Sequence, residues 1–225
     1  MPKEKNGLNY YQFHRHEMLE LLPTHYSKVL EVGCGEGNFR SALSLENEYW
    51  GVEQNIDSAN IAKQKLNNIL IGDYDSVSSN IPNNYFDLII CNDVIEHMTD
   101  HVAFLLNIKQ KLAANGSLVI SIPNVRYMTN LNHLLFAKDW RYTDAGILDR
   151  THLRFFTKKS LTQTLDETSW KVVKIKGINR YGSGSRRGAK QIRFALSYLA
   201  QLIYGRDSAY LQFAARLTDN HKANK

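Results

Sequence analysis

The chain has 225 residues, of which 43% are hydrophobic and 22% charged, and its formal net charge is +6. This length and composition fit one globular α/β domain. Two isolated cysteines exclude a disulfide scaffold and a cysteine-rich metal site, and they fit a reducing compartment, so we expect a cytoplasmic protein. No apolar run reaches the length of a transmembrane helix, and the first residues lack the apolar core of a signal peptide. The mild positive charge fits an anionic substrate, a membrane surface or simply a basic surface.

Predicted strands and helices alternate along most of the chain. Short apolar runs predict strands at 28–32, 48–53, 68–71, 86–91, 117–122, 170–178 and 210–217. Helical periodicity predicts helices at 10–22, 38–45, 57–66, 100–112, 125–136, 160–167 and 191–204. Repeated strand–helix units predict a doubly wound parallel sheet, with its ligand at the carboxyl ends of the strands.

We expect a single domain over residues 1–225, because the chain has no internal repeat or clear linker. An N-terminal helix occupies 1–24, and a ligand-binding core occupies 25–122. Inserted helices follow the fifth strand and separate the last two strands, which makes 123–157 and 179–208 the substrate-side or lid elements.

The most informative segment is the glycine loop that follows the first predicted strand. Gly33, Gly35 and Gly37 alternate there, and a helical pattern follows. Glycines let backbone N–H groups approach a nucleotide closely. Glu31, two residues before the first glycine, would repel a pyrophosphate and favour a cationic ligand. This favours S-adenosylmethionine over a nicotinamide dinucleotide.

Acidic and polar residues stand where the next strands end. Glu53 lies 20 residues after Gly33 and can accept hydrogen bonds from ribose hydroxyls, although a solvated strand-end acid is the alternative. Asp73 can accept a hydrogen bond from the adenine amine, and the side chain of Tyr74 could cover a ring of the ligand. The alternative is that Asp73 only forms a turn after Gly72. The polar residues at 91–97 would meet the reacting end of the ligand.

These motifs together resemble the class I S-adenosylmethionine-dependent methyltransferases, in particular the branch that acts on small molecules. The resemblance rests on Glu-Val-Gly-Cys-Gly-Glu-Gly at 31–37, on Glu53, on Gly72-Asp73, and on Phe86-Asp87 followed by Glu96-His97. It covers about residues 25–178. It implies a Rossmann-like, mostly parallel seven-stranded sheet with a reversed last strand, and S-adenosylmethionine as the cofactor, without a metal.

The resemblance also implies roles for individual positions. The loop at Gly33 and Gly35 should lie under the methionine part of the cofactor, and Glu53 should bind the ribose. Gln54 should lie beside the adenine with Asp73 and the backbone of Tyr74, and Asn92 near the methionine moiety.

A hydroxyl acceptor needs a general base, whereas an amine acceptor needs only to be neutral. The candidates for this base are His97 and His152, with Asp93 and Asp149 behind them. In many relatives the Glu-His pair is mainly a structural feature of its loop, which is the alternative for His97.

A second motif runs over 149–157, where charged residues precede an aromatic pair. With 123–127 it resembles methyltransferases associated with bacterial glycosyltransferases and surface polysaccharide synthesis. That resemblance implies a sugar, nucleotide-sugar or glycan acceptor, and a quinone or lipid-type metabolite is the alternative. Contacts to the acceptor are expected from Asn124, Tyr127, Arg150 and Arg154, although a purely structural loop is equally compatible with the motif.

The segment 186–204 is first basic and then amphipathic. It could touch a membrane surface, form a homodimer, cover the site or pack on its own domain. A specific nucleic-acid substrate is not expected, because Asn92-Asp93-Val94-Ile95 lacks the proline pair common in adenine methyltransferases. A non-catalytic cofactor-binding subunit and a nicotinamide-dependent oxidoreductase are the other functional classes considered.

Overall fold

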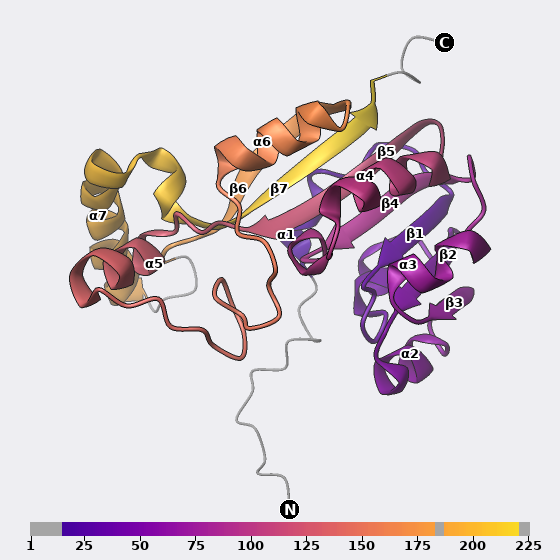
Figure 1. Cartoon of the computed structure of the whole chain (residues 1–225), viewed down its shortest axis with the longest axis horizontal. Coiled ribbons are helices and arrows are strands. Elements are labelled where there is room, and N and C mark those ends of the chain that lie inside the picture. The colour runs from indigo at the N-terminus through magenta and orange to yellow at the C-terminus, as the bar shows by residue number, and fades with distance from the viewer. Residues whose placement is uncertain (1–14, 183–186, 221–225) are drawn as a thin grey trace, which may run out of the picture.

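A single seven-stranded sheet organises the protein (Figure 1). The computed structural model describes residues 15–182 and 187–220. The strands lie in the order β3-β2-β1-β4-β5-β7-β6. Their bounds are Lys28–Val32 (β1), Glu48–Glu53 (β2), Asn68–Ile71 (β3), Phe86–Asn92 (β4), Leu112–Pro123 (β5), Trp170–Arg180 (β6) and Tyr210–Asp219 (β7). The first five strands are parallel, and β7 is antiparallel to both of its neighbours. The predicted mostly parallel sheet with a reversed last strand is therefore confirmed.

Short helices connect these strands. The α-helices are His16–Leu19 (α1), Ile56–Ala62 (α2), Tyr74–Val77 (α3), His101–Lys111 (α4), Met128–Asn132 (α5), Lys158–Glu167 (α6) and Arg187–Tyr204 (α7). Shorter helical turns are Asn38–Ala42 (η2), Ser78–Asn80 (η3), Ile95–His97 (η4), His133–Ala137 (η5) and Arg206–Ala209 (η6). Side chains cap the starts of several helices, as Asp100 does when its carboxylate accepts from the backbone N–H groups of Val102 and Ala103.

Several helix predictions differ from the structure. Within the predicted helix at 10–22, residues 16–19 are helical, and residues 10–14 lie outside the described residues. The segment predicted as a helix at 38–45 is a 3₁₀ turn. Here the Arg40 guanidinium donates to the backbone carbonyls of Leu45 and Asn47, which fixes the chain in an irregular turn after the helical residues. Helix α2, predicted at 57–66, runs over Ile56–Ala62, and the side chain of Asn55 caps its start by accepting from Ser58 N–H.

The core lies on both faces of the sheet. On β4, Ile89 and Cys91 pack in one cluster, while Leu88 and Ile90 pack in the other. A central strand that is buried on both faces needs a continuous apolar sequence, which is what 88–91 supplies. Strand order reverses between β1 and β4, and in such sheets ligands bind at that point, outside the carboxyl ends of the strands.

Candidate functional site

The strands β1, β2 and β4 are neighbours in the sheet, and their carboxyl ends lie side by side. Val32, the last residue of β1, is in register with Val52 on one side and with Cys91 on the other. The glycine loop, Glu53 and the turn after β4 therefore start from neighbouring points. This arrangement brings together three of the segments that the sequence predicts to bind a cofactor.

The glycine loop is fixed to the end of β2 by backbone hydrogen bonds. Gly33 N–H and Cys34 N–H both donate to the carbonyl of Val52, at 2.8 and 3.1 Å. Gly33 has a φ of +71°, and a Cβ at this position would lie 2.8 Å from Cγ2 of Val94. Glycine is therefore required here by both backbone conformation and space.

Glu53 connects this loop to the segment after β2. Its carboxylate accepts from Gly35 N–H at 2.8 Å and from Asn55 N–H at 2.8 Å, and the residue is 9% exposed. A carboxylate has about four lone-pair positions, so these two contacts leave acceptor capacity for ribose hydroxyls. Gln54, the next residue, is exposed beside it.

Asp73 and Tyr74 follow β3, and one side chain is exposed whereas the other is buried. Asp73 is exposed and caps α3, since its carboxylate accepts from Ser76 N–H at 3.0 Å, a contact that lowers its pKa. The ring of Tyr74 is buried against Phe104, and its hydroxyl donates to Asn107 at 2.7 Å. The expectation that this ring covers a ligand is wrong, because it belongs to the core, and only the backbone of Tyr74 remains available to a ligand.

Glu31 is a buried acid on β1, two residues before the glycine loop. It is 3% exposed, and the Tyr49 hydroxyl donates to its carboxyl at 2.8 Å. Burial raises the pKa of Glu31 to about 8, so the group is mainly protonated near neutral pH. A cationic ligand group beside it would favour the ionised form, which fits the charge preference predicted from the sequence.

Asn92 and Asp93 end β4 and have different environments. The side-chain oxygen of Asn92 is buried and has no hydrogen-bond partner among the residues the structure describes. An unpaired buried acceptor is costly, and a donor group on a ligand would satisfy it. This observation, with the acceptors of Glu53 and the glycine loop, fits S-adenosylmethionine, whose ammonium and ribose hydroxyls are donors.

Asp93 is not available as a base. Its carboxylate accepts from Ser121 Oγ at 2.9 Å and from Gln212 Nε2 at 2.7 Å, and it pairs with Arg15. Its side chain is 6% exposed. These three partners occupy the carboxylate and bind it into the sheet. The prediction of a catalytic Asp93 is therefore wrong, because the group connects β4, β5 and β7 to the N-terminal segment.

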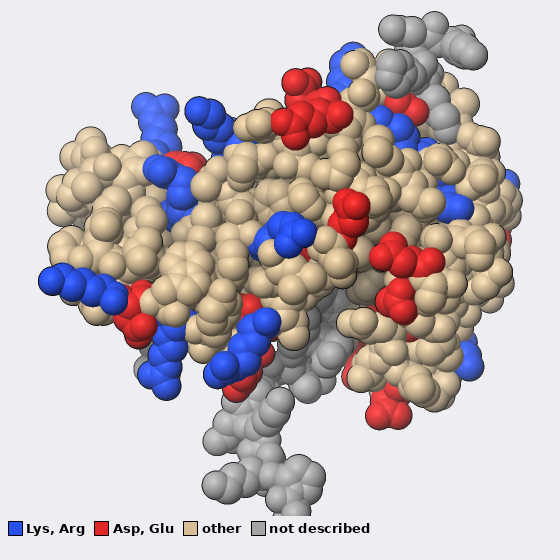
Figure 2. Space-filling model, viewed as in Figure 1, with Lys and Arg blue, Asp and Glu red and all other residues tan. Residues whose placement is uncertain are grey.

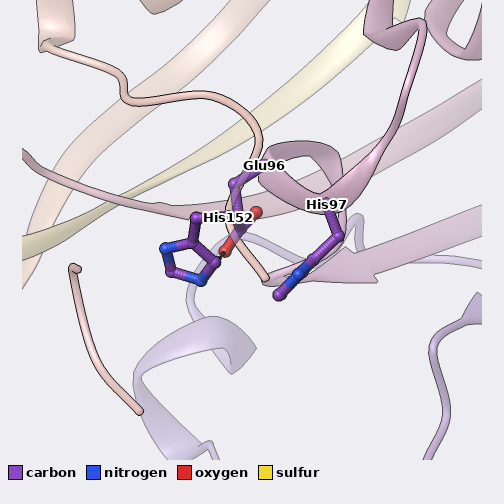
Figure 3. A group of neighbouring side chains, drawn as sticks. All are labelled: Glu96, His97 and His152. Atoms are coloured by element: carbon purple, nitrogen blue, oxygen red, sulfur yellow. Dashed lines mark ion pairs between the residues drawn. The ribbon is translucent and has the colours of Figure 1, made fainter. Parts of the chain in front are cut away.

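Two histidines meet because a distant loop folds back onto the turn after β4. Leu153 N–H and Arg154 N–H donate to the carbonyl of Glu96 at 2.8 and 3.1 Å. The rings of His97 and His152 consequently lie 4.7 Å apart in an edge-to-face arrangement. Figure 3 shows the two rings converging with the Glu96 carboxyl, which is directed at His152.

The hydrogen bonds of these histidines indicate which nitrogen carries the proton. His97 Nδ1 lies 3.2 Å from the carbonyl of Thr151, and His152 Nδ1 lies 2.9 Å from that of Ile147. A carbonyl can only accept, so each Nδ1 carries a hydrogen, and a neutral ring then has its lone pair on Nε2. Burial, followed by the neighbouring His152, lowers the pKa of His97 and keeps this ring neutral. His97 Nε2 can thus accept a proton.

Glu96 completes this group. It is 1% exposed, and both carboxyl oxygens are buried without a hydrogen-bond partner in the described part of the chain. Burial raises its pKa well above the usual range. Ligand atoms of Glu96, His97 and His152 lie within 4.8 Å of one another, so these residue types could together hold a cation. No metal is expected from the sequence, and that remains a prediction.

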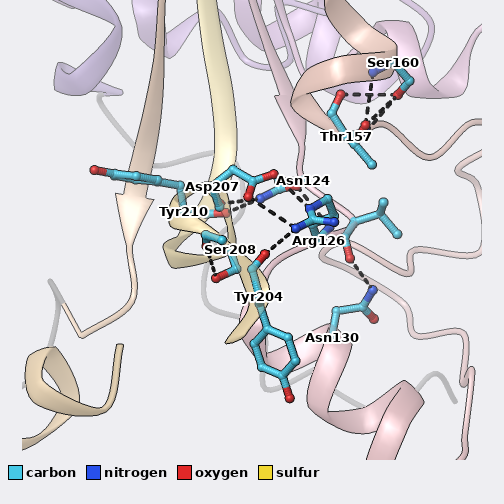
Figure 4. Close-up of polar contacts among 11 residues, drawn as sticks. Asn124, Arg126, Asn130, Thr157, Ser160, Tyr204, Asp207, Ser208 and Tyr210 are labelled. Carbon is cyan, nitrogen blue, oxygen red and sulfur yellow. Dashed lines mark hydrogen bonds and ion pairs between the residues drawn. The ribbon is translucent and has the colours of Figure 1, made fainter. Parts of the chain in front are cut away.

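The residues expected to contact the acceptor are only partly brought together. Asn124 is fully buried, and its amide donates to the carbonyls of Asp207 and Tyr210, both at 2.9 Å. Arg126, two residues further on, pairs with Asp207 at 2.9 Å (Figure 4). Asn124 therefore fastens the chain after β5 to η6, and its predicted role in acceptor binding is wrong.

The two arginines of 149–157 make local contacts. Arg150 forms an exposed ion pair with Asp144 at 3.1 Å. Arg154 donates to the carbonyls of Leu153 and Thr99, both at 2.8 Å. Neither contact is a buried salt bridge, and each uses only some of the guanidinium N–H groups. Binding of an acceptor by Arg150 and Arg154 therefore stays a prediction.

A row of aromatic side chains continues from the histidine pair. The Phe155 ring lies 6.4 Å from His152, 5.3 Å from Trp140 and 6.3 Å from Tyr142. A further pair, Tyr127 and Tyr181, lies 6.1 Å apart. The row was missed from the sequence because its members stand up to 15 residues apart in a segment without periodicity.

Comparison with known proteins identifies the family and the fold. A family model described as "Methyltransferase domain" matches residues 9–175. The chain is 26% identical over 173 residues to a protein of Rickettsia bellii named ubiquinone biosynthesis O-methyltransferase, a match that covers 72% of this chain and 70% of that protein. A mitochondrial protein of the same name from Schizosaccharomyces pombe is 24% identical over 159 residues, which cover 67% of this chain and 57% of that protein.

Among solved structures, a SAM-dependent methyltransferase from Archaeoglobus fulgidus superposes with a TM-score of 0.62 at 19% identity. The superposition covers 85% of each chain. The chain therefore belongs to the methyltransferase family that this domain defines, and its fold is that of a class I S-adenosylmethionine-dependent methyltransferase.

Proposed function

We propose that this protein methylates a hydroxyl group of a small aromatic or quinol-type acceptor, with His97 as general base. The observation that carries the proposal is the neutral His97 ring, whose Nδ1–H is held by the Thr151 carbonyl. That contact leaves Nε2 free to accept the acceptor's proton. S-adenosylmethionine, when bound, supplies an electrophilic methyl carbon on a positively charged sulfur.

The protein's own residues would position the reactants and remove the proton. Glu53, Asn92 and the glycine loop would hold the cofactor, so that the acceptor oxygen can attack in line with the bond that breaks. His97 Nε2 would take the hydroxyl proton as the new oxygen–carbon bond forms, and S-adenosylhomocysteine would leave. His152 and the buried Glu96 would position His97 and exclude water from its inner side.

The aromatic row favours a planar acceptor. Phe155, Trp140 and Tyr142 continue from His152, and such rings pack well against a flat, apolar molecule. The Rickettsia and yeast relatives carry the name ubiquinone biosynthesis O-methyltransferase, which supports the quinone alternative. The sugar or glycan acceptor, the polysaccharide pathway and the cytoplasmic location remain predictions from the sequence, and no comparison supports the pathway.

An acceptor panel tests this proposal. The protein is incubated with labelled S-adenosylmethionine and catechols, short-chain quinols, sugar nucleotides or primary amines, and methylated products are identified by mass spectrometry. We expect transfer to a phenolic or quinol hydroxyl. Transfer to sugars alone would contradict the acceptor class, and cofactor binding without turnover on any acceptor would support the non-catalytic alternative.

Replacing the base should slow the reaction without weakening cofactor binding. We expect His97→Ala to lower kcat by about 10²–10⁴-fold, the usual contribution of a general base. Affinity for S-adenosylhomocysteine, measured by calorimetry, should stay unchanged. His25→Ala is the matched control, because His25 is exposed and precedes β1, at the opposite edge of the sheet. Unchanged turnover of His97→Ala would show that the histidine is structural.

Removing the carboxylate at the end of β2 should weaken cofactor binding. We expect Glu53→Ala to reduce affinity for S-adenosylhomocysteine by about 1–3 kcal/mol, because it removes the ribose acceptor and the support of Gly35. Glu46→Ala, an exposed acid in the turn before β2, should bind normally. Equal affinities of the two variants would refute the ribose assignment.

Cofactor binding should also depend on pH through Glu31. The pKa of about 8 means that this acid is mostly protonated at lower pH. A cationic ligand favours the ionised form, so binding releases a proton, and affinity should rise as pH increases from about 6 to about 8. Calorimetry across this range should show a flatter dependence for Glu31→Gln. An identical dependence in both proteins would exclude Glu31 as the linked group.

A further inference from the structure

Helix α7 turns an apolar stripe toward solvent. Tyr198, Leu199, Leu202 and Ile203 are 60, 61, 84 and 78% exposed. Their spacing of three and four residues places them on one side of the helix. A surface helix normally buries its apolar side, whereas these four apolar side chains of α7 are exposed.

Side-chain contacts of Phe194, Tyr198 and Tyr204 attach α7 to neighbouring elements. The Arg180 guanidinium lies 5.2 Å from the ring centroid of Phe194 and 4.7 Å from that of Tyr198. The hydroxyl of Tyr204 donates to Asn132 at 2.9 Å. These contacts join α7 to the ends of β6 and α5.

A second exposed apolar segment lies next to it. Leu134, Leu135 and Phe136 in η5 are 42, 54 and 75% exposed, and they follow directly on Asn132, the partner of Tyr204. We call these three residues together with Leu199, Leu202 and Ile203 the apolar end. Figure 1 shows α5 and α7 together at one end of the molecule, and Figure 2 shows that end largely free of charge, with Lys and Arg at its margin.

The segments that carry the apolar end hold most of the chain's excess positive charge. Residues 126–141 and 187–207 together contain seven Lys or Arg and two Asp or Glu, a net of +5, compared with +6 for the whole chain. One of the two acids, Asp207, is paired with Arg126. An exposed apolar surface in strongly basic segments is complementary to an anionic, partly apolar partner.

We propose that the apolar end docks this protein onto the surface of an anionic lipid bilayer. Leu202, Ile203 and Phe136 would enter the boundary between headgroups and acyl chains, while the basic residues contact anionic headgroups. The contact is peripheral, since no helix within 15–182 and 187–220 is long and apolar enough to cross a membrane. A second copy of the chain is a poorer partner, because a symmetric pair would bring two like-charged segments together. This inference is independent of the acceptor proposed above.

Vesicle co-sedimentation tests the docking. The full chain is mixed with phosphatidylcholine vesicles that contain about 30% phosphatidylglycerol, or with phosphatidylcholine alone. We expect binding to the anionic vesicles that is about tenfold stronger than to the neutral ones, and that weakens as salt is added. Leu202→Glu should reduce this binding about tenfold, and Phe136→Glu should act in the same direction.

The matched control is Leu45→Glu, which adds the same charge at a leucine that is 80% exposed in the turn before β2. It should bind vesicles as the unchanged protein does. The proposal is overturned if Leu202→Glu and Leu45→Glu bind equally, or if the unchanged protein ignores anionic vesicles. Light scattering on the same samples identifies the competing arrangement: a dimer that Leu202→Glu dissociates, without vesicle binding, would assign this face to a second copy.

Discussion

The hydrogen bond from Gly35 N–H to the Glu53 carboxylate is the contact on which the cofactor half of the site depends. With the two backbone bonds to Val52, it holds the glycine loop against the end of β2. Parallel pairing of β1 with β2 and β4 then fixes where the ends of those strands lie relative to the loop. Because the loop and the acid come from adjacent strands, the carboxylate of Glu53 and the backbone of the glycine loop lie side by side.

The acceptor half depends on a different kind of contact. The turn after β4 and the loop before α6 are more than 50 residues apart, and the carbonyl of Glu96 joins them by accepting from Leu153 and Arg154. That junction places His152 against His97 and extends the aromatic row outward. The proposed base His97, the aromatic row and the apolar end would all suit an aromatic or lipid-type acceptor.

The sequence predicted the sheet, and with it the positions of the glycine loop and Glu53 at neighbouring strand ends, because the signals for these features are local. Apolar runs, glycine spacing and strand-end acids each act within a few residues, and the sheet rules translate them directly into positions. The acceptor half was harder to predict. Asn124 and Asp93 look like site residues in the sequence, yet contacts with Asp207, Tyr210, Ser121 and Gln212, distant along the chain, make them structural. The burial of Tyr74 likewise follows from its packing on Phe104 in another helix.

A crystal structure with S-adenosylhomocysteine and a quinol-type acceptor would test the central claim most directly. The account predicts the ribose hydroxyls within hydrogen-bond distance of Glu53, the methionine end beside Asn92, and the acceptor hydroxyl beside His97 Nε2. A ligand bound at this edge without contact to Glu53, or an acceptor hydroxyl remote from His97, would contradict it.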